Sequence, residues 1–351
     1  MNETMQAAVY HGPDDIRLEE VPVPQINQDE ILVKVLNANI CGTDLRILHG
    51  HHRKYPEGTV RIPGHEMAGR VVKVGEKLRK YQKGDHVFVA PNMGDGDSRE
   101  TISGNNNLDP NFRAIGINLD GAFAEYMRVP AAAIRQGNVM KISPDEDPAV
   151  AALIEPLACV VRGQNAVNLH SGDFAVVMGA GPIGVMHMIV AKARGAGHVL
   201  VSEPLEFRRN QATELGADGV VDPINEDLSL IVQEISEGRG ADVIIVAAPS
   251  KIAQESALQI AAIRGRINLF GGLPKDDSLI RFDSNMVHYK ELLVTGTTAC
   301  STYDCLQAAD LVRSGRMDLG VLVTKRFPLS EVKQAFEAAE DGTNLRVSIT
   351  P

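Results

Sequence analysis

Four metal-ligating side chains stand in the first half of the chain, ahead of a glycine-rich turn. They are the thiol of Cys41, the imidazole of His65 and the carboxylates of Glu66 and Glu155. Sulfur, imidazole nitrogen and carboxylate oxygen are ligands of zinc in proteins, and a catalytic zinc keeps one coordination position open. The turn at residues 179–184 suits a pyrophosphate. A metal that polarises an alcohol oxygen beside a bound nicotinamide is the simplest chemistry that uses both features.

The glycine turn has the spacing of a dinucleotide-binding loop. It follows the apolar run 174–178, precedes a helical pattern over 185–194, and reads Gly179-Ala180-Gly181-Pro182-Ile183-Gly184. In that context Gly179 permits the tight turn, Gly181 close approach to the pyrophosphate, and Gly184 contact between helix and strand. The amides at the helix start, around Pro182 and Ile183, would face the anion. The structural alternative is a glycine-rich turn without a ligand.

A carboxylate follows the next predicted strand and bears on the choice of cofactor. Glu203 stands 203 minus 184, or 19, residues beyond the last glycine of the turn. It is placed to accept hydrogen bonds from a ribose 2′-hydroxyl, and its charge would repel a 2′-phosphate. NAD is therefore predicted over NADP. Arg208 and Arg209 remain the open alternative, since arginines there serve either a phosphate or a solvated helix start.

Length and composition indicate a globular chain of two domains. The chain has 351 residues, 44% hydrophobic and 23% charged, and a formal charge of −10. Two hydrophobic cores are expected at this length, and the acidic balance without a basic run argues against nucleic acid. The N-terminus lacks the pattern of a signal peptide and no stretch reaches membrane-spanning length, so a cytoplasmic protein is expected. The cysteines, Cys41, Cys159, Cys300 and Cys305, show no scaffold spacing, and we expect no disulfides.

The apolar patterns divide the chain into two parts. Residues 5–150 show short strand-like runs bounded by Gly, Pro, Asn or Asp, which predicts mostly antiparallel β structure, interrupted by a polar surface loop or lobe at 92–119. From residue 174 strands and helices alternate, which predicts a doubly wound parallel sheet. The α/β chain is therefore divided into a catalytic domain, 1–152 with 299–351 returning to it, and a dinucleotide-binding domain, 153–298.

Specific short motifs run along nearly the whole chain. They are Cys41-Gly42-Thr43-Asp44, Gly64-His65-Glu66 with Gly69 and Val74-Gly75, Gly84-Asp85-His86-Val87, Phe123-Ala124-Glu125-Tyr126, Glu155-Pro156-Leu157-Ala158 and the glycine turn. Together they resemble the zinc-dependent medium-chain dehydrogenase family, especially its polyol (sorbitol-like) and threonine dehydrogenase branches. The resemblance implies a GroES-like catalytic domain, a Rossmann cofactor domain and a catalytic zinc between them.

The resemblance also implies roles for individual residues. Zinc would be held by Cys41, His65 and Glu155, with Glu66 either a ligand or bridged through water. Thr43 matches the hydroxyl that starts a proton relay, and Asp44 matches a carboxylate that steadies the site. A helix-entry carboxylate is the alternative for Glu155.

Two departures from the family pattern stand out. No cysteine occurs between Cys41 and Cys159, so the structural zinc that many relatives carry is expected to be absent, leaving one zinc per chain. Arg46 stands where many relatives have histidine, which leaves the outer end of the relay open. His49, His51 and His52 are nearby candidates, and a solvated loop is the alternative for each.

The sequence thus predicts a zinc-dependent dehydrogenase that transfers hydride between a sugar alcohol, or another secondary alcohol, and NAD. L-Threonine or a simple secondary alcohol is the alternative substrate. A metal-free reductase of the same superfamily and a non-catalytic NAD-binding protein are the rival functions. Relatives are usually dimers or tetramers, and the predicted edge strand 291–295 is a candidate for pairing with a second copy.

Overall fold

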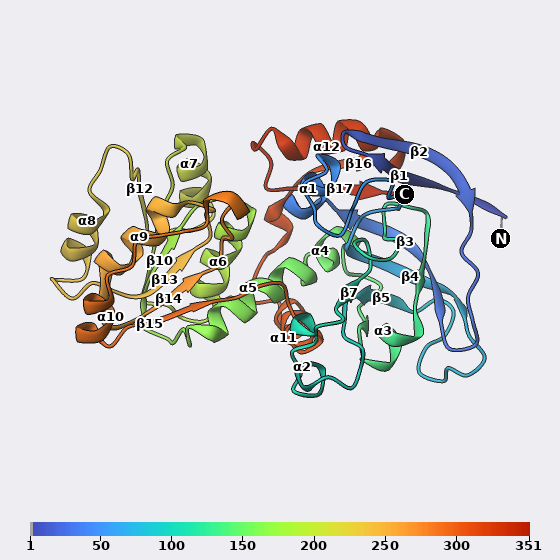
Figure 1. Cartoon of the computed structure of the whole chain (residues 1–351), viewed down its shortest axis with the longest axis horizontal. Helices are drawn as coiled ribbons and strands as arrows, with labels where there is room; N and C mark the ends of the chain where they lie inside the picture. The colour runs from blue at the N-terminus through green and yellow to red at the C-terminus, as the bar shows by residue number, and fades with distance from the viewer. Residues whose placement is uncertain (1–2) are drawn as a thin grey trace. The chain divides into compact units, whose positions relative to one another are not determined.

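The computed structural model describes residues 3–351 and divides the chain into two compact units (Figure 1). Unit 1 comprises Met1–Ala158 and Cys300–Pro351, and unit 2 comprises Cys159–Ala299. The chain passes from unit 1 to unit 2 within helix α5 (Ile154–Ala166). Across the described residues, no helix is both long and apolar enough to cross a membrane.

Unit 1 is built on a seven-stranded sheet in which all pairs but one are antiparallel. The strand order is β16-β17-β3-β4-β5-β9, with β8 also pairing β3, and only β16 and β17 run parallel. The strands are β3 (Ile31–Asn39), β4 (Glu66–Val74), β5 (His86–Val89), β8 (Tyr126–Val129), β9 (Val139–Lys141), β16 (Val323–Pro328) and β17 (Arg346–Thr350). Beside the sheet, β1 (Thr4–Gly12) and β2 (Asp15–Pro22) form an antiparallel pair. The predicted β-rich first half is confirmed.

The end of the chain completes the sheet of its beginning. Strand β17 pairs with β3, and helix α12 (Val332–Glu340) packs on β16 and β17; in Figure 1 these red segments lie beside the blue ones. Phe336 of α12 meets Phe123 edge to face, with ring centroids 5.7 Å apart. Both rings belong to the main hydrophobic core, so the C-terminal segment is part of the fold of unit 1.

The polar segment 92–119 carries more structure than a loop. It contains β6 (Asn92–Met93), α2 (Arg99–Ile102), the 3₁₀ turn η1 (Asn106–Leu108) and β7 (Arg113–Ala114). Its organising group is the buried carboxylate of Asp109, which accepts hydrogen bonds from the Asp95 amide (3.1 Å), the Ser98 hydroxyl, the Thr101 hydroxyl (2.6 Å) and the Asn111 amide (2.7 Å). We call residues 92–119 the lobe.

The remaining helices of unit 1 are short except for one. They are α1 (Gly42–Leu48), α3 (Ala131–Arg135), α4 (Pro148–Ala152), α11 (Thr302–Arg313) and the 3₁₀ turns η3 (Gly320–Leu322) and η4 (Leu329–Glu331).

Unit 2 is a six-stranded parallel sheet in the order β12-β11-β10-β13-β14-β15. Its strands are β10 (Phe174–Met178), β11 (His198–Ser202), β12 (Gly219–Val221), β13 (Ala241–Val246), β14 (Ala261–Leu269) and β15 (Leu293–Gly296). They alternate with α6 (Pro182–Ala193), α7 (Glu206–Glu214), α8 (Leu228–Ile235), α9 (Lys251–Ile260), the 3₁₀ turn η2 (Lys275–Asp277) and α10 (Ser284–Lys290). The order 3-2-1-4-5-6 is that of a dinucleotide-binding sheet, so the predicted Rossmann fold is confirmed.

Candidate metal centre and cofactor site

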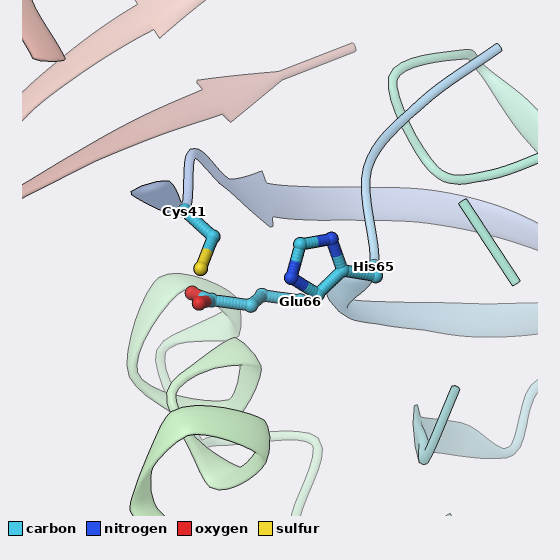
Figure 2. Close-up of side chains that lie close together, drawn as sticks. All are labelled: Cys41, His65 and Glu66. Carbon is cyan, nitrogen blue, oxygen red and sulfur yellow. The ribbon is translucent and has the colours of Figure 1, made fainter. Parts of the chain in front are cut away.

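Strand pairing brings three of the predicted metal ligands together in unit 1. Cys41 follows the end of β3 and immediately precedes α1, while His65 and Glu66 stand at the start of β4, which pairs with β3. The ligand atoms of the three side chains all lie within 4.8 Å of one another. Figure 2 shows the thiol, the imidazole and the carboxylate converging on one point.

A buried carboxylate orients the imidazole. Asp44 Oδ1 lies 3.4 Å from His65 Nδ1, and Asp44 Oδ2 accepts a hydrogen bond from the Cys41 amide (2.9 Å). Asp44 is completely buried. A histidine that ligates a metal commonly has its other ring nitrogen held by a carboxylate, which fixes the ring and its tautomer. The structure thus places Asp44 in contact with two of the three candidate ligands.

A buried arginine that the sequence did not indicate lies behind Glu66. Arg346 on β17 places Nη1 3.2 Å from Glu66 Oε1, and the same nitrogen donates to the carbonyl of Ile40 (3.2 Å). Arg346 is 4% exposed and Glu66 is fully buried. The sequence shows Arg346 only as a charged residue at the start of a short strand, and it does not reveal the partner of that residue.

The donor set fits a divalent cation. Both carboxylate oxygens of Glu66 are buried and accept no hydrogen bond, although Arg346 Nη1 lies 3.2 Å from Oε1. Buried polar groups are rarely left unpaired, and a bound cation would satisfy them. Thiolate, imidazole and carboxylate are also the ligand classes that zinc accepts.

The protonation of the group agrees with this fit. Burial alone raises the pKa of the Cys41 thiol. The hydrogen bond and charge of His65, and then the charge of Arg346, outweigh burial and lower that pKa to about 6. Burial raises the pKa of Glu66 well above its ordinary value, against the opposing charge of Arg346. A cation at this point would favour the thiolate and the ionised carboxylate together.

The predicted relay residue, Thr43, lies in the first turn of α1, two residues after Cys41. Thr43 Oγ1 accepts a hydrogen bond from Arg46 Nη2 (3.2 Å). Of the nearby histidines, His49 is engaged elsewhere, with Nδ1 2.6 Å from Asp14 Oδ1 and Nε2 2.7 Å from Glu340 Oε1. His52 is partly buried, and burial together with the charge of Arg46 lowers its pKa.

Glu155 stands apart from the three converging ligands. It lies in the first turn of α5, 6% exposed, and its Oε1 accepts a hydrogen bond from Cys300 Sγ (3.6 Å). Its charge raises the pKa of Glu66, so the two carboxylates interact electrostatically. The contact with Cys300 is a second feature that the sequence did not reveal, because Cys300 enters from the far end of the chain.

In unit 2 the glycine turn joins β10 to α6. Gly179 adopts φ +107°, and a Cβ on Gly184 would lie 1.8 Å from the carbonyl oxygen of Gly179. A Cβ on Gly181 would meet nothing within 4 Å. Pro182 and Ile183 form the first turn of α6, with Gly181 as its N-cap. The turn therefore leaves open space at the helix start, where backbone amides favour an anion.

Glu203 contacts this turn through its carboxylate. Its Oε2 accepts a hydrogen bond from the Ala180 amide (2.7 Å), and its Oε1 accepts one from the Leu205 amide (3.0 Å). Gly179, Glu203 and Arg208 line one cavity of about 970 Å³. The Arg208 guanidinium also lies 5.6 Å from the ring centroid of Phe207, whereas Arg209 pairs with Asp222 (3.3 Å).

Comparison with known proteins agrees with both sites. Residues 27–142 match the alcohol dehydrogenase GroES-like domain, and residues 182–314 match the zinc-binding dehydrogenase domain. The chain is 35% identical to L-threonine 3-dehydrogenase of Pyrococcus furiosus over 99% of both chains.

Solved structures resemble the chain over its whole length. A zinc-binding dehydrogenase from Sinorhizobium meliloti 1021, bound to NADP, is 29% identical with a TM-score of 0.90 over 100% of both chains. A protein described as a short chain alcohol dehydrogenase from Escherichia coli CFT073, in complex with NADH, is 26% identical with a TM-score of 0.89 over 100% of both chains. Together with the ligand cluster and the glycine turn, these likenesses place the chain in the zinc-dependent medium-chain dehydrogenase family, as an oxidoreductase that uses zinc and a nicotinamide cofactor.

Proposed function

We propose that this enzyme oxidises a sugar alcohol or another secondary alcohol with NAD. The observation that carries the proposal is the group of Cys41, His65 and Glu66, whose ligand atoms all lie within 4.8 Å of one another. The carboxylates of Glu66 and Glu155 suit a substrate with several hydroxyl groups, because an ionised carboxylate has two oxygens that accept hydrogen bonds from hydroxyl groups. L-Threonine is the alternative, supported by the relative from Pyrococcus furiosus.

The proposed metal centre holds one zinc through Cys41, His65 and Glu155, with Glu66 a ligand or bridged through water. When bound, zinc makes an alkoxide available near neutral pH. The chain's own residues orient the ligating side chains and accept the proton of the alcohol. Asp44 fixes the ring of His65, and Arg346 neutralises Glu66.

Thr43 is the proposed first acceptor of the alcohol proton. Arg46 donates to Thr43 Oγ1 and is not a proton acceptor, since a guanidinium stays protonated. The proton therefore leaves Thr43 toward solvent, without passing through Arg46.

A single zinc per chain is proposed because hydrogen bonds organise the lobe. Asp109 joins the Asp95 amide to two hydroxyl groups and to the Asn111 amide, and no cysteine stands in the segment. Metal analysis is expected to give about one equivalent of zinc.

NAD is proposed over NADP because of the fixed charge on Glu203. Two backbone amides hold its carboxylate at the rim of the cavity that Gly179 also lines. That charge would repel a 2′-phosphate and accept a ribose hydroxyl. We expect kcat/KM to be higher with NAD than with NADP. The ratio of the two kcat/KM values should be smaller in Glu203→Ala than in the wild type.

We further propose a cytoplasmic homodimer or homotetramer. Strand β15 ends the sheet of unit 2 and has a partner on one side only within residues 3–351, which leaves one edge open for a second copy.

The decisive test is Cys41→Ser. Loss of the thiolate should remove zinc and nearly all turnover while NAD still binds, because Gly179 and Glu203 belong to unit 2. Zinc is measured by mass spectrometry of the metal and NAD by calorimetry, in parallel with the wild type. Full turnover in zinc-free Cys41→Ser would contradict the proposal.

A panel of substrates resolves the class of alcohol. Polyols, aldoses, inositols, simple secondary alcohols and L-threonine are each tested for NADH formation. A polyol with the highest kcat/KM supports the main proposal, and L-threonine with the highest value supports the alternative. Alcohol-dependent NADH formation with any of them excludes a protein that only binds NAD.

A further inference from the structure

Two buried thiols lie side by side at the start of α11. Cys300 Sγ and Cys305 Sγ are 3.7 Å apart, and the two residues are 0% and 1% exposed. Cys300 is the residue before the N-cap Ser301, and Cys305 follows in the first turn of the helix. No role in the proposed chemistry has been assigned to either thiol.

Helix capping fixes this geometry. Ser301 Oγ accepts a hydrogen bond from the Asp304 amide (3.2 Å), and the Asp304 carboxylate accepts one from the Ser301 amide (2.8 Å). A capping box of this kind sets the angle at which the chain enters the helix, and it brings the residue before the cap against the fourth helical residue. Apolar side chains usually fill these two positions, and here both carry sulfur.

The Cys300 sulfur also has polar contacts that an apolar pair would not need. It donates to Glu155 Oε1 (3.6 Å), and Asn92 Nδ2 lies 3.6 Å from it while also donating to the Cys300 carbonyl (2.8 Å). A shift of roughly 1.6 Å along the line between the two sulfurs would reach the length of an S–S bond. Once the S–S bond has formed, Cys300 has no S–H group left to donate to the Glu155 carboxylate.

We propose that Cys300 and Cys305 form a reversible disulfide, and that its formation removes the thiol that orients Glu155. Formation of the disulfide stands independently of the proposed function; its effect on zinc rests on Glu155 being a zinc ligand. Intracellular disulfides of this kind are usually transient and redox-sensing, which fits a chain in which none of the four cysteines forms a disulfide in this structure.

The oxidation balances with a peroxide as the oxidant. One thiol loses its proton, and the resulting thiolate attacks an oxygen of hydrogen peroxide. The O–O bond breaks, the sulfur becomes a sulfenic acid, and the hydroxide that leaves takes up the proton to form water. The second sulfur then displaces the sulfenic oxygen as a second water, forming the S–S bond. Two thiols are oxidised and one peroxide is reduced to two waters. A dithiol reductant reverses the reaction by exchange.

Oxidation is expected to weaken zinc retention. The groups that hydrogen-bond a ligating carboxylate fix its orientation, and loss of such a group lowers metal affinity by on the order of 10-fold. The oxidised protein should therefore release zinc to a chelator about 10-fold more readily than the reduced protein.

The experiment exposes the zinc-loaded, full-length protein to hydrogen peroxide and compares it with Cys305→Ala. Alanine keeps an apolar residue in the first turn and cannot form the disulfide. The wild type should lose about 2 Da, restored by dithiothreitol. Trypsin leaves both cysteines in residues 291–313, so fragmentation should show no cleavage between positions 300 and 305. Cys305→Ala should show neither the mass loss nor faster zinc release.

Each contrary outcome overturns a definite part of the proposal. A wild type that keeps its mass, or that is oxidised only at Cys41, excludes the disulfide. A disulfide that forms without changing zinc release excludes the link to Glu155. Faster zinc release in oxidised Cys305→Ala, equal to that of the wild type, assigns the effect to another thiol. The mass measurement needs no turnover, so it remains informative even where the proposed function fails.

Discussion

His49 joins two distant parts of unit 1 through its two ring nitrogens. Asp14 precedes β2 and Glu340 ends α12, and both carboxylates contact the ring, at 2.6 and 2.7 Å. Asp14 first, and Glu340 second, raise the pKa of His49 above its ordinary value. Because the folded-state pKa exceeds the unfolded value of about 6.5, the stabilisation is complete below about pH 6.5. It is lost as the pH rises through the folded-state pKa.

The variant His49→Gln tests this contribution. The difference in unfolding free energy between wild type and variant should be largest at pH 5.5 to 6 and should shrink toward alkaline pH. Urea denaturation across this range measures it, with the exposed His288→Gln in unit 2 as the matched control. A difference that stays constant with pH would rule out a charged His49.

Loss of Arg346 should destabilise unit 1, because Arg346 pairs with the buried Glu66. Replacing it with Met leaves the carboxylate of Glu66 buried without its counter-ion, which typically costs about 3–5 kcal/mol. Urea unfolding of the zinc-free protein measures the loss. The double variant Arg346→Met with Glu66→Gln should recover part of it, and saturating zinc should reduce it. A zinc-free Arg346→Met as stable as the wild type would show that the pair contributes nothing.

At this scale the sequence indicated the candidate ligands by type but did not indicate their surroundings. Cys41, His65 and Glu66 were recognisable by type and by motif, and β3–β4 pairing brings them together. Arg346 and Cys300 were not recognisable, because only the fold brings them to their partners. Strand β17 carries Arg346 beside β3, and the chain before α11 carries Cys300 beside Glu155.

At the scale of elements, the glycine turn offers a matched pair of variants. Gly181 has φ −68° and open space around its Cα, so Gly181→Ala should fold normally and weaken NAD binding by at least about tenfold, because the methyl group would meet the pyrophosphate. Gly184→Ala should instead lower the melting temperature, since its Cβ would lie 1.8 Å from the Gly179 carbonyl oxygen. Calorimetry with NAD and thermal unfolding separate the two effects. Unchanged NAD affinity in Gly181→Ala would show that the pyrophosphate does not bind at this turn.

The elements themselves followed from periodicity wherever one pattern was sustained. In unit 2 the predicted apolar run 174–178 coincides with β10, and the predicted helix 185–194 and edge strand 291–295 overlap α6 and β15. The lobe was harder to predict, because its short elements have no apolar repeat and depend on one carboxylate. Asp109 accepts hydrogen bonds from groups spread over its own segment, and such a centre leaves no periodic signal in a sequence.

At the scale of the whole molecule, β15 makes a prediction about assembly. The strand ends the parallel sheet, and Leu293 on it is 47% exposed. Leu293→Lys places a charge on this edge and should shift the protein toward a smaller species in sedimentation velocity. Leu279→Lys, at a residue 86% exposed in the same unit, is the matched control. An unchanged sedimentation coefficient for Leu293→Lys would place the contact between copies elsewhere.

The Asp109-centred lobe has a consequence for how the protein behaves when zinc is scarce. A domain whose loop is stapled by a tetrathiolate ion unfolds locally once that ion is withdrawn, and its bared cysteines then oxidise or cross-link. In this lobe, backbone amides and hydroxyl groups donate hydrogen bonds to the Asp109 carboxylate, and these bonds do not depend on the supply of a metal. If the lobe carries no zinc, as proposed, zinc depletion should abolish turnover while this segment stays folded, and turnover should return when zinc is added back.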